Sequence, residues 1–150
     1  MESSKEAIPA LILLLLKENM KESNYITNSR AAEAIIHDKM QTLDHEEVWA
    51  IFLDRRARVI EMQMLSKGTL SQTSIDCRTV LRNALLVNAA SVILLHNHPS
   101  GDPRPSVQDV NFTAKLKRAC SLLDVLLIDH IVLGEESFYS FADDTTTNYQ

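Results

Sequence analysis

Strand-like and helix-like runs of apolar residues alternate along most of this chain. Short apolar runs bounded by turn residues predict strands at 48–54, 58–66, 91–96 and 125–133, and a short edge strand at 138–141. Apolar residues spaced three or four apart predict helices over 30–40, 76–88 and 107–123. This order predicts an α/β fold in which a mixed β-sheet is flanked by helices on both faces.

The two ends of the chain differ from this central pattern. The apolar run 7–16 predicts a short helix with Pro9 in its first turn, and it is too short to cross a bilayer. It lacks a small-residue cleavage site, so we expect neither a membrane anchor nor a secretion signal. Since it is apolar nearly all round, it should pack on this domain or on a second copy, giving a homo-oligomer. We therefore expect an N-terminal helical extension at 1–29, a metal-binding domain at 30–143 and a frayed tail at 144–150.

Composition narrows the possible functions. The 150 residues, 45% of them hydrophobic, suit one domain with a single core. The net charge of −5 argues against strong nucleic-acid binding, which needs Lys and Arg to neutralise phosphates. The basic cluster at 55–58 lies between two predicted strands, so an exposed hairpin turn is favoured over a nucleic-acid contact. Cys77 and Cys120 stand alone, which predicts core thiols in a reducing, cytoplasmic compartment.

The segment after the predicted strand 91–96 carries the chemistry. In extended backbone, side chains two residues apart share a face, so His96 and His98 can converge on one cation. Asp109 can supply a third ligand from the start of the next helix, where Ser106 is the expected N-cap. Two imidazoles and a carboxylate suit Zn²⁺ and leave its fourth position open for catalysis.

Each half of this pattern has a simpler interpretation when it is taken alone. Loop histidines are common, and Ser-x-x-Asp usually marks only the start of a helix. Their combination at a strand end favours the metal site. Because a metal would take one Asp109 oxygen, we expect the Ser106 side chain to cap the helix and the reciprocal bond from Asp109 to be absent.

The same residues resemble a known signature. His-x-His, seven residues, Ser, two residues and Asp is the motif of the JAB/MPN+ (JAMM) metalloproteases, and the fuller string His-Asn-His-Pro-Ser-Gly-Asp-Pro resembles their RadC-like branch. The resemblance covers about residues 30–143. Further stretches look like blocks of that family in the same order, namely 46–54, 66–69, Arg78, 83–90, 127–132 and 139–141.

The resemblance implies a cytidine-deaminase-like architecture and a zinc metallopeptidase that acts on a peptide or protein substrate. It assigns zinc to His96, His98 and Asp109, oxyanion assistance to Ser106, and general-base catalysis to an acid on the first core strand. Counting back from Asp54 places that acid at Glu46. Strand alternation turns the neighbouring Glu47 to the opposite face.

Two other functions stay open at this point. A non-catalytic scaffold on the same fold is possible, although the intact ligand set argues against it. A role associated with DNA repair is suggested by the family, whose longer members carry an N-terminal helix-hairpin-helix region. Residues 1–29 contain no hairpin glycines, which weakens that suggestion. His130 is a candidate for a place behind the site, with a purely structural role favoured.

Overall fold

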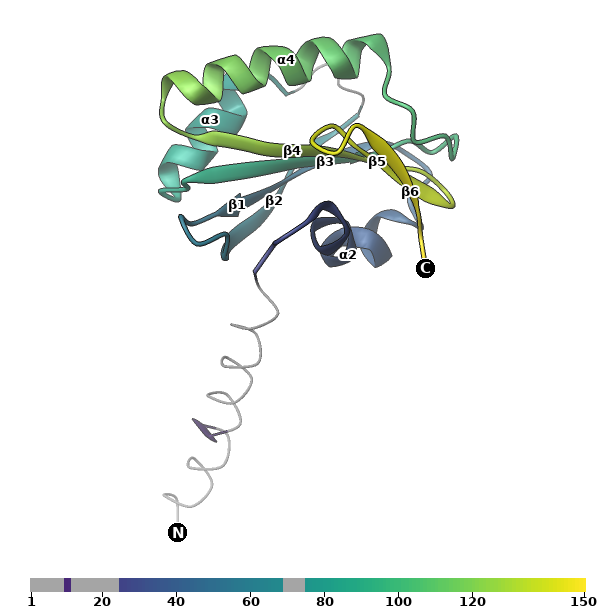
Figure 1. Ribbon diagram of the computed structural model, residues 1–150, viewed down its shortest axis with the longest axis horizontal. Helices are drawn as coiled ribbons and strands as arrows, with labels where there is room; N and C mark the ends of the chain where they lie inside the picture. The colour runs from purple at the N-terminus through teal and green to yellow at the C-terminus, as the bar shows by residue number, and fades with distance from the viewer. Residues whose placement is uncertain (1–9, 12–24, 69–74) are drawn as a thin grey trace.

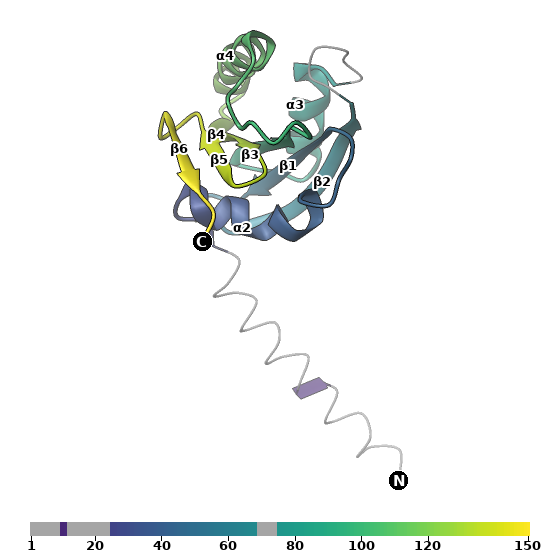
Figure 2. The ribbon, with the colours of Figure 1, turned by 90° about the vertical axis from the view of Figure 1, so that its right-hand side faces the viewer.

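The computed structural model describes residues 10–11, 25–68 and 75–150. Within them, six strands form one sheet in the order β2-β1-β3-β4-β5-β6. The strands are β1 (Glu47–Leu53), β2 (Val59–Lys67), β3 (Ser91–Asn97), β4 (Leu126–Leu133), β5 (Ser137–Ser140) and β6 (Thr145–Asn148). The helices that cover it are α2 (Ser29–Met40), α3 (Cys77–Leu86) and α4 (Val107–Leu122). Figures 1 and 2 show α3 and α4 on one face and α2 on the other, which confirms the predicted α/β architecture.

The sheet is mixed because β3 and β4 are parallel and the other neighbours are antiparallel. β1 and β2 form the predicted hairpin through the basic turn. Asp54 holds that turn: its Oδ1 accepts from the backbone N–H groups of Arg56 and Arg58, at 2.9 and 3.0 Å. Arg55, Arg56 and Arg58 are all exposed, as expected for a turn in solvent.

Two separate cores lie against the two faces of the sheet. Every residue of β1 and β3 is buried, so successive side chains pack alternately into one core and the other. Val48, Ala50 and Phe52 join the core under α3 and α4, whereas Trp49, Ile51 and Leu53 join the core against α2. The first core also holds Cys77 and Cys120 as free, buried thiols, as the sequence predicted.

A β-bulge in β4 sets which side chains face which core. Val92 pairs with Leu127 while the next residue, Ile93, pairs with Asp129, so Ile128 is an extra residue in the ladder. After the bulge, Asp129 shares the register of the α2-facing residue Ile93. His130 pairs with Leu94, which faces α3 and α4. The bulge therefore turns His130 toward the helix that carries Asp109.

The loop from β3 to α4 is held against the turn between β4 and β5. The His98 N–H donates to the Leu133 carbonyl at 2.9 Å, and the Glu135 N–H donates to the Gly101 carbonyl at 2.9 Å. Gly134 lies at the crossing point. A Cβ atom there would lie 2.5 Å from the Gly101 oxygen and 2.8 Å from Pro103 Cδ, so only glycine fits.

The ends of the domain differ from the sequence-based boundaries. Residues 25–29, assigned above to the extension, pack with the domain: Tyr25 bridges to Arg58, and Ile26 is buried in the α2-side core. The tail expected to be frayed instead forms β6, which displaces β5 from the sheet edge. β6 is polar, so backbone pairing rather than apolar burial holds it, and hydrophobic patterning carries no signal for it.

The expected N-terminal helix falls outside the described residues except for Ala10 and Leu11, which are helical and exposed. Among the described helices, we find none with the length and apolar character needed to cross a membrane.

We predict that Gly134→Ala lowers the free energy of unfolding by about 1–3 kcal/mol, the usual cost of overpacking. Gly134 has no positive φ, so the loss would come from the clash with the metal-site loop. Urea denaturation measures it, with the exposed neighbour Glu135→Gln as a control expected to change little. Parent-like stability of Gly134→Ala would mean that the loop can move away freely.

Candidate metal centre

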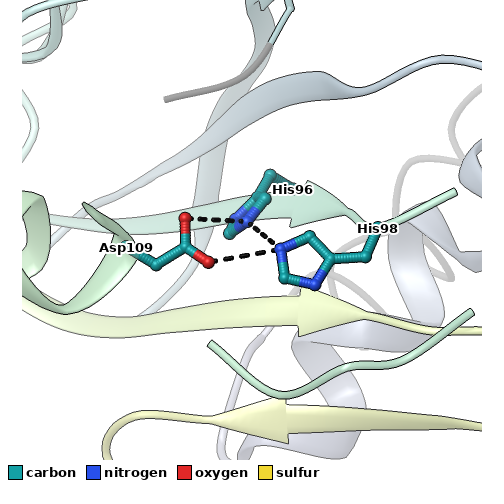
Figure 3. Close-up of side chains that lie close together, drawn as sticks. All are labelled: His96, His98 and Asp109. Carbon is teal, nitrogen blue, oxygen red and sulfur yellow. Dashed lines mark hydrogen bonds and ion pairs between the residues drawn. The ribbon is translucent and has the colours of Figure 1, made fainter. Parts of the chain in front are cut away.

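Three side chains from two elements converge at the carboxyl end of β3. His96 is the penultimate residue of β3, His98 follows its end, and Asp109 lies in the first turn of α4. The two histidine Nε2 atoms are 3.0 Å apart, and they lie 3.3 and 3.2 Å from the Asp109 carboxylate oxygens (Figure 3). These residues form a group able to hold a metal ion. The structure thus brings together the predicted ligand set.

A capping box orients the Asp109 carboxylate. The Asp109 N–H donates to Ser106 Oγ at 3.0 Å, and the Ser106 N–H donates to Asp109 Oδ2 at 2.8 Å. The expectation that the reciprocal bond would be absent is therefore wrong. A carboxylate oxygen has more than one lone pair, so Oδ2 can accept from Ser106 and still face His98, and Oδ1 is left to face His96.

A backbone carbonyl fixes the ring of His98. Its Nδ1 lies 2.8 Å from the Asp102 carbonyl oxygen, which can only accept, so Nδ1 carries a hydrogen and donates. In the neutral ring, Nε2 then keeps a free lone pair directed at Asp109 and His96. A second partner that selects the ligating nitrogen is typical of metal-binding histidines.

The electrostatics of the group suit a cation. Burial alone would lower the pKa of His98, but hydrogen bonds to the Asp109 carboxylate and the Asp102 carbonyl, with the charges of Asp109 and Glu46, raise it above its usual value. Burial would raise the pKa of Asp109, but hydrogen bonds from His96 and His98 hold it far below its usual range. A proton or metal ion shared by these groups is thus stabilised, and two nitrogens with one carboxylate match the donors zinc prefers.

The structure separates the two neighbouring glutamates. The Glu47 carboxylate is buried on the α2 side, where it accepts from the Trp49 indole N–H at 3.1 Å and contacts His45 at 2.8 Å. Glu46 lies two residues before Val48, which pairs with His96 and faces α3 and α4. Glu46 is partly exposed and directly precedes β1, so strand alternation continued back from Val48 would place it on the face of the histidines.

Two further residues lie directly behind the ligands. His130 contacts His96, with 2.7 Å between His130 Nε2 and His96 Nδ1, and Thr113 Oγ1 lies 2.5 Å from His130 Nδ1. The sequence marked His130 as a candidate for this position but favoured a structural role. Sequence reasoning missed Thr113 entirely, although its place one turn after Asp109 on the same helix face was a usable signal.

Comparison with known proteins agrees with this geometry. A family model described as a RadC-like JAB domain matches residues 26–146. This chain belongs to that family. The matched range includes residues 26–29 and the start of β6, in accord with the domain limits seen in the structure.

Curated relatives of the RadC-like domain are named UPF0758 proteins. The one from Vibrio cholerae is 48% identical over 105 residues, which cover 70% of this chain and 66% of the relative. The one from Porphyromonas gingivalis is 38% identical over 128 residues, 85% of this chain and 56% of the relative. The one from Leptothrix cholodnii is 39% identical over 141 residues, 94% of this chain and 64% of the relative. The chain thus spans between half and two thirds of these relatives.

We predict that the purified domain binds one zinc per chain and that His98→Ala abolishes stoichiometric binding while the fold survives, since both hydrophobic cores exclude the three ligands. Metal analysis and circular dichroism test this. Cys77→Ser/Cys120→Ser is the control and should bind zinc as the parent does. Stoichiometric zinc binding by the His96→Ala/His98→Ala protein would contradict the ligand assignment.

Proposed function

We propose that this RadC-like domain is a zinc-dependent hydrolase of the metallopeptidase type, which cleaves a peptide or isopeptide bond. The observation that carries the proposal is the convergence of His96, His98 and Asp109, with the charge of Glu46 close enough to help raise the pKa of His98. A structural zinc site normally closes four protein ligands around the ion. Three convergent ligands beside a partly exposed acid favour catalysis instead.

The three ligands would hold zinc through His96 Nε2, His98 Nε2 and an Asp109 oxygen. Zinc bound there would supply Lewis acidity, which lowers the pKa of water to near 7 and polarises a carbonyl group. The protein itself contributes a rigid arrangement of the ligand side chains. His96 is fully enclosed, and the capping box fixes Asp109, so the ligands are positioned before the metal arrives.

Glu46 is the proposed general base. Its carboxylate would take a proton from the attacking water and pass it to the leaving amine. Glu46 is partly exposed, so substrate can reach it, and its charge acts on His98, so it is near the ligands. Both features suit a general base. Glu47 is unsuited because Trp49 and His45 already occupy its carboxylate on the other face.

Ser106 can serve both the helix and the reaction. In the capping box its Oγ accepts a hydrogen bond from the Asp109 N–H, which uses a lone pair and leaves the hydroxyl hydrogen free. The side chain is exposed beside the ligand Asp109. Its hydroxyl could therefore donate to the oxyanion that forms as water attacks the carbonyl.

A peptide or protein is the proposed partner, and the two free buried cysteines favour a cytoplasmic setting. The activity of the longer relatives is part of the same proposal, since this chain spans only part of their length. A scaffold without catalysis is the main competitor, and assays of cleavage and zinc content separate it from a hydrolase.

We predict that zinc-loaded protein cleaves members of a peptide and isopeptide library, scored by mass spectrometry, and that chelation stops cleavage. Glu46→Gln should keep zinc and lose about 10²–10⁴-fold in turnover, the usual contribution of a general base. Glu47→Gln is the matched control and should stay near the parent rate. Full zinc occupancy without any cleavage would favour the scaffold, and loss of activity only in Glu47→Gln would reverse the assignment of the base.

We predict two separable effects of Ser106→Ala. Loss of the helix cap should cost about 1 kcal/mol of stability, measured by urea denaturation. Loss of an oxyanion donor should lower turnover by about 10²–10³-fold with zinc still bound. Ser106→Gly is the control for the cap, because glycine is tolerated at N-caps and supplies no hydroxyl. A variant that is less stable but equally active would restrict Ser106 to capping.

A further inference from the structure

A chain of short contacts leads from the ligand His96 into the protein interior. His96 Nδ1 lies 2.7 Å from His130 Nε2, and His130 Nδ1 lies 2.5 Å from Thr113 Oγ1. Thr113 Oγ1 lies 2.7 Å from the backbone carbonyl oxygen of Asp109. Both histidine side chains are fully enclosed. The contacts thus run from one ligand to the backbone of another, through two residues that do not belong to the ligand set.

The Asp109 backbone carbonyl, at the inner end of this series of contacts, determines where each hydrogen lies. The Asp109 carbonyl can only accept, so the single hydroxyl hydrogen of Thr113 points to it. Thr113 Oγ1 must then accept from His130, which places the His130 ring hydrogen on Nδ1. Within the part of the chain that the structure describes, no carboxylate pairs with the enclosed His130 ring, so a charge there would be unfavourable, the ring is neutral and Nε2 is bare. His96 must therefore donate from Nδ1.

We infer that Thr113 and His130 are positioning residues, which hold His96 in the tautomer whose Nε2 lone pair faces the metal site. This inference deepens the proposed function, and it rests on that function only for the identity of the metal. Without this series of hydrogen bonds, His96 could carry its hydrogen on Nε2 and block its own ligand atom. The selection of a ligating nitrogen by its ring partner is a general feature of metal-bound histidines, but here the partner is a second neutral histidine.

Neighbouring side chains and the backbone hold the His96, His130 and Thr113 side chains in these contacts. The ring of His130 stacks on Phe141, with ring centres 4.8 Å apart and planes at 4°. The bulge at Ile128 turns His130 to this face, and α4 carries both Asp109 and Thr113 one helical turn apart. The orientation of the Asp109 backbone is thereby linked to the tautomer of His96. The two elements that supply the ligands are thus joined behind the site as well as at the ligands themselves.

The first test requires neither metal nor substrate. Ring ¹⁵N chemical shifts of the metal-free protein at neutral pH report which nitrogen of each histidine carries hydrogen. We expect hydrogen on Nδ1 of both His96 and His130. A His96 ring that carries hydrogen on Nε2 and none on Nδ1 would overturn the inference. Since this result does not depend on zinc binding, it stays informative if the proposed hydrolase function fails.

The second test removes the hydroxyl group that links His130 to the Asp109 carbonyl, with a side chain of nearly the same shape in its place. Thr113→Val deletes the acceptor for His130, so a hydrogen can move to His130 Nε2 and drive the His96 hydrogen to Nε2. We expect zinc affinity, measured by chelator competition, to fall about 10–100-fold, as is usual for partners of metal ligands. Thr113→Ser restores the hydroxyl and should restore both affinity and tautomer.

A control separates this effect from simple loss of packing. Cys120→Ala creates a small cavity in the same helix, in the core away from the contact chain, and should leave zinc affinity unchanged. Thr113→Val with parent-like zinc affinity and an unchanged His96 tautomer would overturn the inference. If Thr113→Ser and Cys120→Ala both weaken zinc as much as Thr113→Val does, packing rather than hydrogen bonding is the cause, which also overturns it.

Discussion

The junction between the end of β3 and the first turn of α4 is the constraint on which the site depends. Two histidines and one aspartate from these elements place four ligand-capable atoms within about 3 Å of their neighbours. Such a cluster of acceptors is unfavourable without a shared proton or cation. The capping box and the Asp102 carbonyl hold the residues in place, so the fold supplies the positioning, and a bound cation would offset the clustering of acceptors.

Two hydrophobic cores keep this junction rigid without taking part in it. Each central strand contributes alternate residues to both faces, so helices on either side fix the sheet. The ligands lie at the end of these layers, where buried packing gives way to a loop that is pinned to the turn between β4 and β5. This arrangement allows removal of a ligand to affect chemistry while leaving the body of the domain folded.

The parts of the molecule that sequence could predict are those with a local signal. Strand and helix periodicity gave the sheet and its covering helices, and the spacing from His96 to Asp109 gave the ligand group. Alternation alone predicted that Glu47 shares the face of Trp49, and the contact between these two side chains confirms it. β6 escaped prediction because its polar residues are held by backbone pairing to β5. Thr113 escaped because its partner, His130, is brought to it by tertiary structure.

The bulge in β4 changes how this strand tolerates variation in length. Because Ile128 is an extra residue, it alone determines that Asp129 shares the register of one core and His130 that of the other. Regular pairing of the same residues without the bulge would exchange them, placing a carboxylate behind His96 and a histidine beside Ser140, which now donates to Asp129. Deleting Ile128 would instead leave both side chains in their present register, so the strand tolerates the loss of this residue but not its pairing with Ile93.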